Sequence, residues 1–169
     1  PLVLFATDQG DAAYREGDTI ECAKVIKRWL DERGGRRAPE QIRIESFTGQ
    51  PNLYDAMFSV YQRKIAKYEN TCTGDVYLLC AGGTPACNTA LILAGTIGFR
   101  ERAYVLIVDP GQVTATPLAI GRQILDSYRR SNLHQLLSRR DFDGVAACPG
   151  NGNRVRRLAR AASARMNFD

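Results

Sequence analysis

Short apolar runs alternate with longer amphipathic stretches along this chain. Residues 2–6 are apolar without interruption, which is typical of a strand buried in a parallel sheet. Residues 42–47 alternate between apolar and polar side chains and predict a second strand near a sheet edge. Two further strands are expected at residues 75–80 and 104–108, and residues 113–116 fit an antiparallel edge strand that returns after a turn.

Helices are predicted between and after these strands, over about residues 18–33, 53–67, 85–99, 121–138 and 154–166. Asp18 is expected to cap the first helix, with Glu21 completing a capping box. Residues 142–148 fit either a strand or a short helix. The alternation predicts an α/β fold with a mostly parallel sheet flanked by helices, followed by C-terminal connecting helices.

The helix that begins at Pro85 differs from the others because it is apolar on nearly all sides. Such a helix is buried on several faces, and a homodimer interface is one way to bury it in a small domain. Pro85 fits the first helical turn, where its missing N–H costs nothing. We therefore expect a homodimer that is formed through this helix.

Two loops follow predicted strands and carry distinctive chemistry. In parallel sheets of this kind, ligands lie beyond the carboxyl ends of the strands. The first loop holds Thr7, Asp8 and Gln9, and the second holds Gly82, Gly83, Thr84 and Pro85. The glycines permit a close approach to the backbone, and the bare N–H groups of a helix N-terminus suit a phosphate, although a plain turn between strand and helix has the same form.

The side chains of these loops indicate a pocket with few charges. Thr7, Gln9, Thr84 and Asn88 supply hydroxyls and amides. Asp8 is an acceptor suited to ribose hydroxyls or to an exocyclic amine, unless it caps its own loop. The combination favours a site for a nucleotide or an oligonucleotide.

Charge is distributed unevenly along the 169 residues. Residues 1–118 are almost neutral, whereas residues 119–169 hold ten Arg and four Asp, a net charge of +6. We expect a ligand-sensing domain over residues 1–118 and a helical connector over residues 119–169 that leads to a further domain. The basic connector would attract nucleic acid, form a solvated face, or pair with a neighbouring domain, and these alternatives stay open.

Several functional classes lack their signatures in this sequence. There is no glycine-rich dinucleotide fingerprint, no P-loop and no nucleophile elbow. The five cysteines form no Cys-x-x-Cys and are expected to be reduced buried thiols, so neither a metal site nor a cofactor is predicted. Arg129 and His134 match the letters of an Arg-x-x-x-x-His ribonuclease motif, but they lie in the connecting helix and no catalytic residue is assigned.

No apolar run is long enough to cross a bilayer, and no signal peptide begins this sequence. A cytoplasmic location is therefore expected. A membrane anchor in a segment outside this sequence stays open.

The two loop motifs together resemble those of the CRISPR-associated Rossmann-fold (CARF) sensor domains of type III CRISPR accessory effectors. The likeness rests on Thr7-Asp8-Gln9 after one strand and Gly82-Gly83-Thr84-Pro85 after another. Residues 116–118, 120–122 and 141–146 are similar to the segment that joins such a sensor to its effector, and residues 164–169 to the start of a following helical module.

The resemblance implies a Rossmann-like fold and a homodimer whose cleft binds cyclic oligoadenylate of four or six units. It implies that Thr7, Asp8, Gln9 and residues 82–85 line this cleft, and that binding activates an effector domain in the same parent chain during antiviral defence. Many members carry a lysine just after the Gly-Gly-Thr, where this chain has Pro85 and Ala86. This difference favours sensing, while a ring nuclease that cleaves the ligand and an unrelated nucleotide-binding regulator are the alternatives.

Overall fold

The computed structural model describes residues 1–10, 15–35, 39–108, 111 and 114–166. The chain divides into two compact units, Pro1–Leu118 and Ala119–Asp169. The first unit holds β1 (Leu2–Thr7), η1 (Arg15–Gly17), α1 (Ile20–Arg33), β2 (Ile42–Phe47), α2 (Tyr54–Glu69), β3 (Val76–Cys80), α3 (Pro85–Phe99), η3 (Arg100–Arg102), β4 (Ala103–Ile107) and β5 (Thr116–Leu118). The second unit holds α4 (Ile120–Ser138), α5 (Phe142–Ala147) and α6 (Asn153–Met166).

The strands of the first unit form two sheets. β1 and β2 pair in parallel, with Thr7 opposite Phe47 at their carboxyl ends. β3 and β4 also pair in parallel, with Cys80 opposite Ile107, and β5 runs antiparallel along the free edge of β4. The predicted α/β class, with parallel strands flanked by helices, is confirmed.

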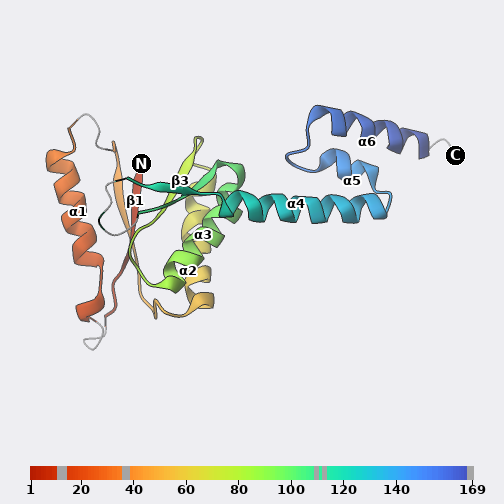
Figure 1. The fold of residues 1–169 in the computed structure, drawn as a ribbon. Helices are drawn as coiled ribbons and strands as arrows, with labels where there is room; N and C mark the ends of the chain where they lie inside the picture. Colours follow the sequence, from red (N-terminus) through yellow and green to blue (C-terminus); the bar gives the residue numbers. More distant parts are fainter. Residues whose placement is uncertain (11–14, 36–38, 109–110, 112–113, 167–169) are drawn as a thin grey trace. The chain divides into compact units, whose positions relative to one another are not determined.

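Helices flank these strands within the first unit (Figure 1), with α3 packed on β3 and β4. α1 lies against β1 and β2, while α2 and α3 pack extensively on each other. Tyr61 of α2 makes edge-on ring contacts with Phe5 of β1 and Phe47 of β2. The ring centroids are 4.9 Å apart in the first pair and 5.9 Å apart in the second. The buried core is therefore centred on α2 and α3, and it includes Met57, Ile65, Leu78, Ala90 and Val105.

Two sequence predictions about element ends are wrong. Asp18 does not cap α1: the helix begins at Ile20 after Thr19, and the Asp18 carboxylate instead accepts a hydrogen bond from the Gln9 N–H at 2.7 Å. The antiparallel edge strand occupies Thr116–Leu118 rather than residues 113–116, and residue 113 lies outside the described residues. Pro117 is tolerated there because β5 is an edge strand.

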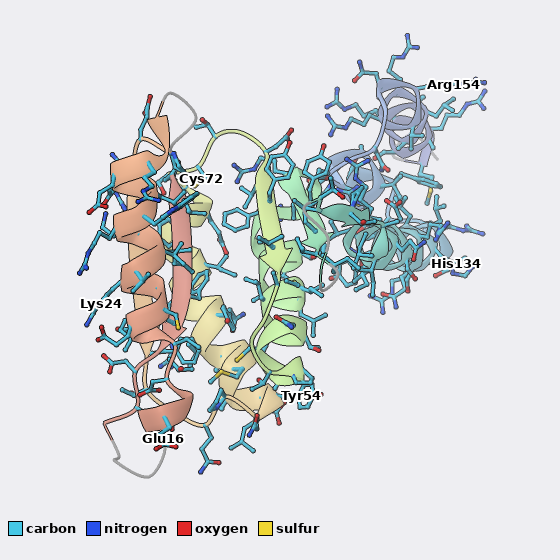
Figure 2. All side chains as sticks on the ribbon, turned by 60° about the vertical axis from the view of Figure 1, so that its left-hand side comes forward. Glu16, Lys24, Tyr54, Cys72, His134 and Arg154 are labelled. Carbon is cyan, nitrogen blue, oxygen red and sulfur yellow. The ribbon has the colours of Figure 1, made fainter. Side chains whose placement is uncertain are left out.

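The second unit is helical throughout its described elements. Of residues 142–148, which fitted a strand or a helix, residues 142–147 form α5. Asp141 caps this helix, since its carboxylate accepts a hydrogen bond from the Gly144 N–H at 2.7 Å. α5 packs against both α4 and α6 (Figure 1). Side chains crowd the surface of this unit, with Arg154 at the start of α6 (Figure 2). Among the described helices, none is both long enough and apolar enough to cross a membrane.

Candidate functional site

The loop after β1 is held to the start of α1 by its own polar groups. The Thr7 N–H donates to the Thr19 hydroxyl at 2.9 Å, and the Thr19 N–H donates to the Thr7 hydroxyl at 3.0 Å. Thr7 is buried, whereas Asp8 is exposed and Gln9 is half-buried. Thr7 therefore links the end of β1 to the residue before α1, and Asp8 lies on the surface of the loop.

The loop after β3 makes a sharp turn into α3. Gly82 and Gly83 have φ values of 83° and 78°, a region that residues with a side chain rarely adopt. Thr84 caps α3, since its hydroxyl oxygen accepts a hydrogen bond from the Cys87 N–H at 3.2 Å. Pro85 occupies the first turn as predicted, so the turn presents exposed glycines at the beginning of a 15-residue helix.

Asn88 lies one helical turn after Thr84 and faces the glycine turn. A Cβ atom placed on Gly83 would be 3.7 Å from the Asn88 Oδ1 atom. The amide of Asn88 is thus next to the backbone of the turn, where it is half-buried. Of the residues predicted for this part of the site, Gly83, Thr84 and Asn88 lie together.

A third loop, which the sequence reasoning did not include, is bonded to the second predicted loop. The loop between β2 and α2 spans residues 48–53. At its β2 end, the Asp8 N–H donates to the carbonyl of Phe47, the last residue of β2, at 2.9 Å, which continues the pairing of β1 with β2. Its other end is held by the Thr84 hydroxyl, which donates to the Pro51 carbonyl, and that same carbonyl accepts from the Cys87 thiol at 3.4 Å. The β2–α2 loop is therefore hydrogen-bonded to the start of α3, and it follows directly on the strand that pairs with β1.

The nearby titratable groups do not suggest nucleophilic chemistry. Burial raises the pKa of the Cys80 thiol, which keeps it protonated at neutral pH. Burial also raises the pKa of Tyr61 above its ordinary range. No group of three His, Cys, Asp or Glu side chains suited to a metal ion occurs in the described part of the chain. The arrangement is suited to binding through backbone N–H groups, amides and one carboxylate.

The outer side of α2 and α3 carries a shallow apolar groove. Its volume is about 220 Å³, and its lining consists of Tyr54, Asp55, Phe58, Thr89, Ala90 and Leu93. Tyr54 projects from the first turn of α2 (Figure 2). Leu93 and Ile97 lie one turn apart on α3 and are 36% and 54% exposed, so this face of the helix is uncovered in a single chain.

Comparisons with known proteins give a match in structure but not in sequence. No family model matches the chain, and no curated protein matches it. The solved structure of Enterococcus italicus Csm6 bound to cyclic hexa-2'-fluoro-hexa-dAMP superimposes with a TM-score of 0.70 at 17% sequence identity. The match covers 98% of this chain and 47% of that one, so this chain spans about half the length of its structural neighbour. The resemblance predicted from the two loops is thereby confirmed at the level of the fold.

Proposed function

We propose that this chain is a CARF sensor domain that binds cyclic oligoadenylate. The observation that carries the proposal is the match in fold, over nearly the whole chain, to a protein solved with a cyclic hexanucleotide. The loops after β1 and β3 both follow the carboxyl ends of parallel strands, which is where α/β folds bind nucleotides. The hydroxyl, amide and carboxylate groups of these loops are also suited to a nucleotide or an oligonucleotide.

The residues divide into those that face the ligand and those that hold the loops. In the proposal, the N–H groups at the start of α3 and the backbone of Gly82 and Gly83 contact phosphate oxygens. Asp8 accepts hydrogen bonds from ribose hydroxyls or an adenine amine, and Gln9 and Asn88 offer amide groups. Thr7, Thr84 and Pro85 shape the two loops around these contacts.

A homodimer completes the proposed site. A cyclic ligand with two-fold symmetry is matched by a dimer with the same symmetry, so each protomer would supply one copy of the loops. The exposed face of α3 is the proposed interface. α4, α5 and α6 would carry the signal to an effector domain in the same parent chain, in keeping with the greater length of the structural neighbour.

Calorimetric titration of the folded dimer with cyclic tetraadenylate and cyclic hexaadenylate tests the proposal. We expect one of the rings to bind at one site per dimer, and linear hexaadenylate to bind at least tenfold more weakly. Asp8→Ala should weaken binding, whereas Asp75→Ala should not, because Asp75 is an exposed carboxylate that precedes β3 at its opposite end. Failure of both rings to bind the folded dimer would overturn the proposal.

The same site is proposed to bind its ligand without cutting it. Pro85 and Ala86 stand where a cation would stabilise the charge of a cleavage transition state, and the Thr84 hydroxyl already bonds to Pro51 and Cys87. Chromatography of the bound ring after long incubation should recover it intact. Linear products that vanish in Thr7→Ala or Thr84→Ala would favour the ring nuclease instead.

A further inference from the structure

The loop between β2 and α2 is fixed beside the second predicted ligand loop. The Asp8 N–H binds the carbonyl of Phe47, the last residue of β2, just before the loop begins, and the Thr84 hydroxyl binds the Pro51 carbonyl near its end. The Leu53 N–H closes a turn on the Gln50 carbonyl at 3.2 Å. A surface loop that begins at a paired strand, closes an internal turn and is bonded to a helix has lost much of its freedom, so groups on it are already positioned for a ligand.

The tip of this loop presents amide side chains to solvent. Gln50 and Asn52 flank Pro51, and both are exposed. The Pro51 carbonyl accepts hydrogen bonds from the Thr84 hydroxyl and from the Cys87 thiol at 3.4 Å, which places this residue next to the start of α3. The two amides therefore lie on either side of a residue that contacts the proposed phosphate-binding helix.

Amide side chains are suited to one base in particular. The oxygen of Asn or Gln accepts a hydrogen bond from the adenine N6 amine while its nitrogen donates to N7. Unpaired bases in single-stranded ligands are splayed out and read on these edges. A guanine or hypoxanthine presents a carbonyl at position 6, which cannot donate to the amide oxygen.

We infer that the β2–α2 loop is a third wall of the ligand site, that Gln50 and Asn52 read adenine, and that Thr84 is a positioning residue that holds this wall in place. The inference rests on the proposed function and deepens it. It changes the role of Thr84: the hydroxyl acts through Pro51 on the neighbouring amides, and not on the ligand itself.

Calorimetry with cyclic hexaadenylate and cyclic hexainosinate tests the base-reading step. The wild-type chain should prefer the adenine ring, and Gln50→Ala or Asn52→Ala should reduce the affinity for that ring by roughly tenfold. The affinity of these variants for the inosine ring should change much less, so that the variants no longer prefer adenine over inosine. Gln62→Ala is the matched control, since Gln62 is an exposed amide in the middle of α2.

The outcomes separate this inference from the proposed function. If the wild-type chain binds neither ring, the proposed function fails. If it binds the adenine ring and both amide variants keep the wild-type preference, the third wall is excluded while the proposed function stands. If the chain binds cyclic tetraadenylate more tightly than cyclic hexaadenylate, the same comparison is made between cyclic tetraadenylate and cyclic tetrainosinate.

Thr84 is tested by exchanging its hydroxyl group. Thr84→Ser keeps the donor to Pro51 and should retain the adenine preference, whereas Thr84→Val removes the donor and should reduce it in the same way as Gln50→Ala. Hydrogen exchange of the amides in residues 48–53 should become faster in Thr84→Val. A purely structural role would lower stability but leave the ratio of the two affinities unchanged, and that result would overturn the assignment of Thr84.

Discussion

Glu45 on β2 is the acceptor of a half-buried polar cluster whose donors lie on α2. Its carboxylate accepts hydrogen bonds from the Lys64 ammonium at 2.8 Å and the Tyr68 hydroxyl at 2.8 Å, and the Lys67 ammonium lies at 3.4 Å. Hydrogen bonding to Lys64 is the main reason that the pKa of Glu45 falls from 4.5 to about 2. The cluster fastens β2 to α2, so its ionisation contributes to folding.

The pH dependence of stability should reveal this cluster. Because the pKa of Glu45 is lower in the folded state, its stabilising effect is complete above pH 4.5 and is lost as the pH falls towards 2. Glu45→Gln should lower the free energy of unfolding at pH 7 by about 1–2 kcal/mol. Urea unfolding at pH 7 and pH 3 should show a smaller difference between wild type and variant at pH 3. The exposed Glu32→Gln is the control, and an equal loss at both pH values would contradict the assignment.

Arg100 holds an unusual backbone conformation at the end of α3. Its φ of 54° and ψ of −124° lie in a region that only glycine adopts without strain, and its side chain is exposed. Arg100→Gly should therefore raise the free energy of unfolding by about 1 kcal/mol. Thermal and urea unfolding measure the change. The matched control is Arg28→Gly within α1, where the normal helical backbone makes the same substitution destabilising by about 1 kcal/mol.

Residue types led to the choice of two candidate loops, but they did not show which polar group of each residue is free to bind a ligand. Thr7 and Thr84 were natural candidates because hydroxyls suit a nucleotide site. The structure engages the Thr7 hydroxyl with Thr19 and the Thr84 hydroxyl with Pro51. Both partners come from other segments, 12 and 33 residues away, so no local pattern could have shown these bonds.

At the scale of elements, the sequence predicted most helices and strands from their hydrophobic periods. The errors fall at the ends, where hydrogen bonds decide the boundary. Asp18 and Glu21 have the spacing of a capping box, but the Asp18 carboxylate binds the Gln9 N–H, a contact with the preceding loop that outweighs the local motif. Residues 142–147 were ambiguous because a short apolar run fits both periods, and the cap from Asp141 decides for a helix.

Glycines set how closely α3 approaches its neighbours. A Cβ atom on Gly95 would lie 2.8 Å from the Leu78 Cδ2 atom of β3, and even closer to Cδ1. Gly98 has the same role towards α2, since its Cβ would lie 2.9 Å from the Ile65 Cγ2 atom. The helix can therefore pack against the strand and the neighbouring helix only because these positions lack side chains.

Gly95→Ala should lower the free energy of unfolding by about 1–2 kcal/mol, because overpacking outweighs the gain in helix propensity. Chemical denaturation measures the loss. Leu78→Ala should lower the free energy of unfolding by less in the Gly95→Ala background than in the wild type, because the two side chains compete for the same space. Gly74→Ala is the control, since nothing lies within 4 Å of its added Cβ. Additive effects of the pair would contradict a direct contact.

At the scale of the whole molecule, the sequence indicated the class but not how the strands are grouped. β1 and β3 both read as buried parallel strands, yet β1 pairs with β2 and β3 pairs with β4 in separate sheets. Strand partners are chosen by contacts that are distant in sequence, and a local period of two carries no information about them. The loop from β2 to α2 was missed for the same reason, since only the folded chain brings Pro51 to Thr84.

The uncovered face of α3 leads to a prediction about assembly. Leu93 and Ile97 are exposed on the same side of the helix and continue the apolar groove that Tyr54 and Phe58 line. Exposed apolar surface of this kind is a frequent mark of an interface between proteins. A two-fold dimer through this face would contain two copies of the α3 N-terminus, and so two proposed phosphate sites.

Ile97→Glu places a charge on this proposed interface and should convert the proposed dimer to a monomer. Sedimentation equilibrium measures the mass, and calorimetry on the same sample should show the affinity for cyclic oligoadenylate falling by at least tenfold, because a monomer offers only half of the contacts. Val25→Glu is the control: Val25 is 61% exposed on α1, which packs on β1 and β2, and its substitution should change neither mass nor affinity. A variant at Ile97 that stays dimeric would place the interface elsewhere. A monomeric variant that keeps full affinity would separate ligand binding from assembly, and the symmetric site would then be excluded.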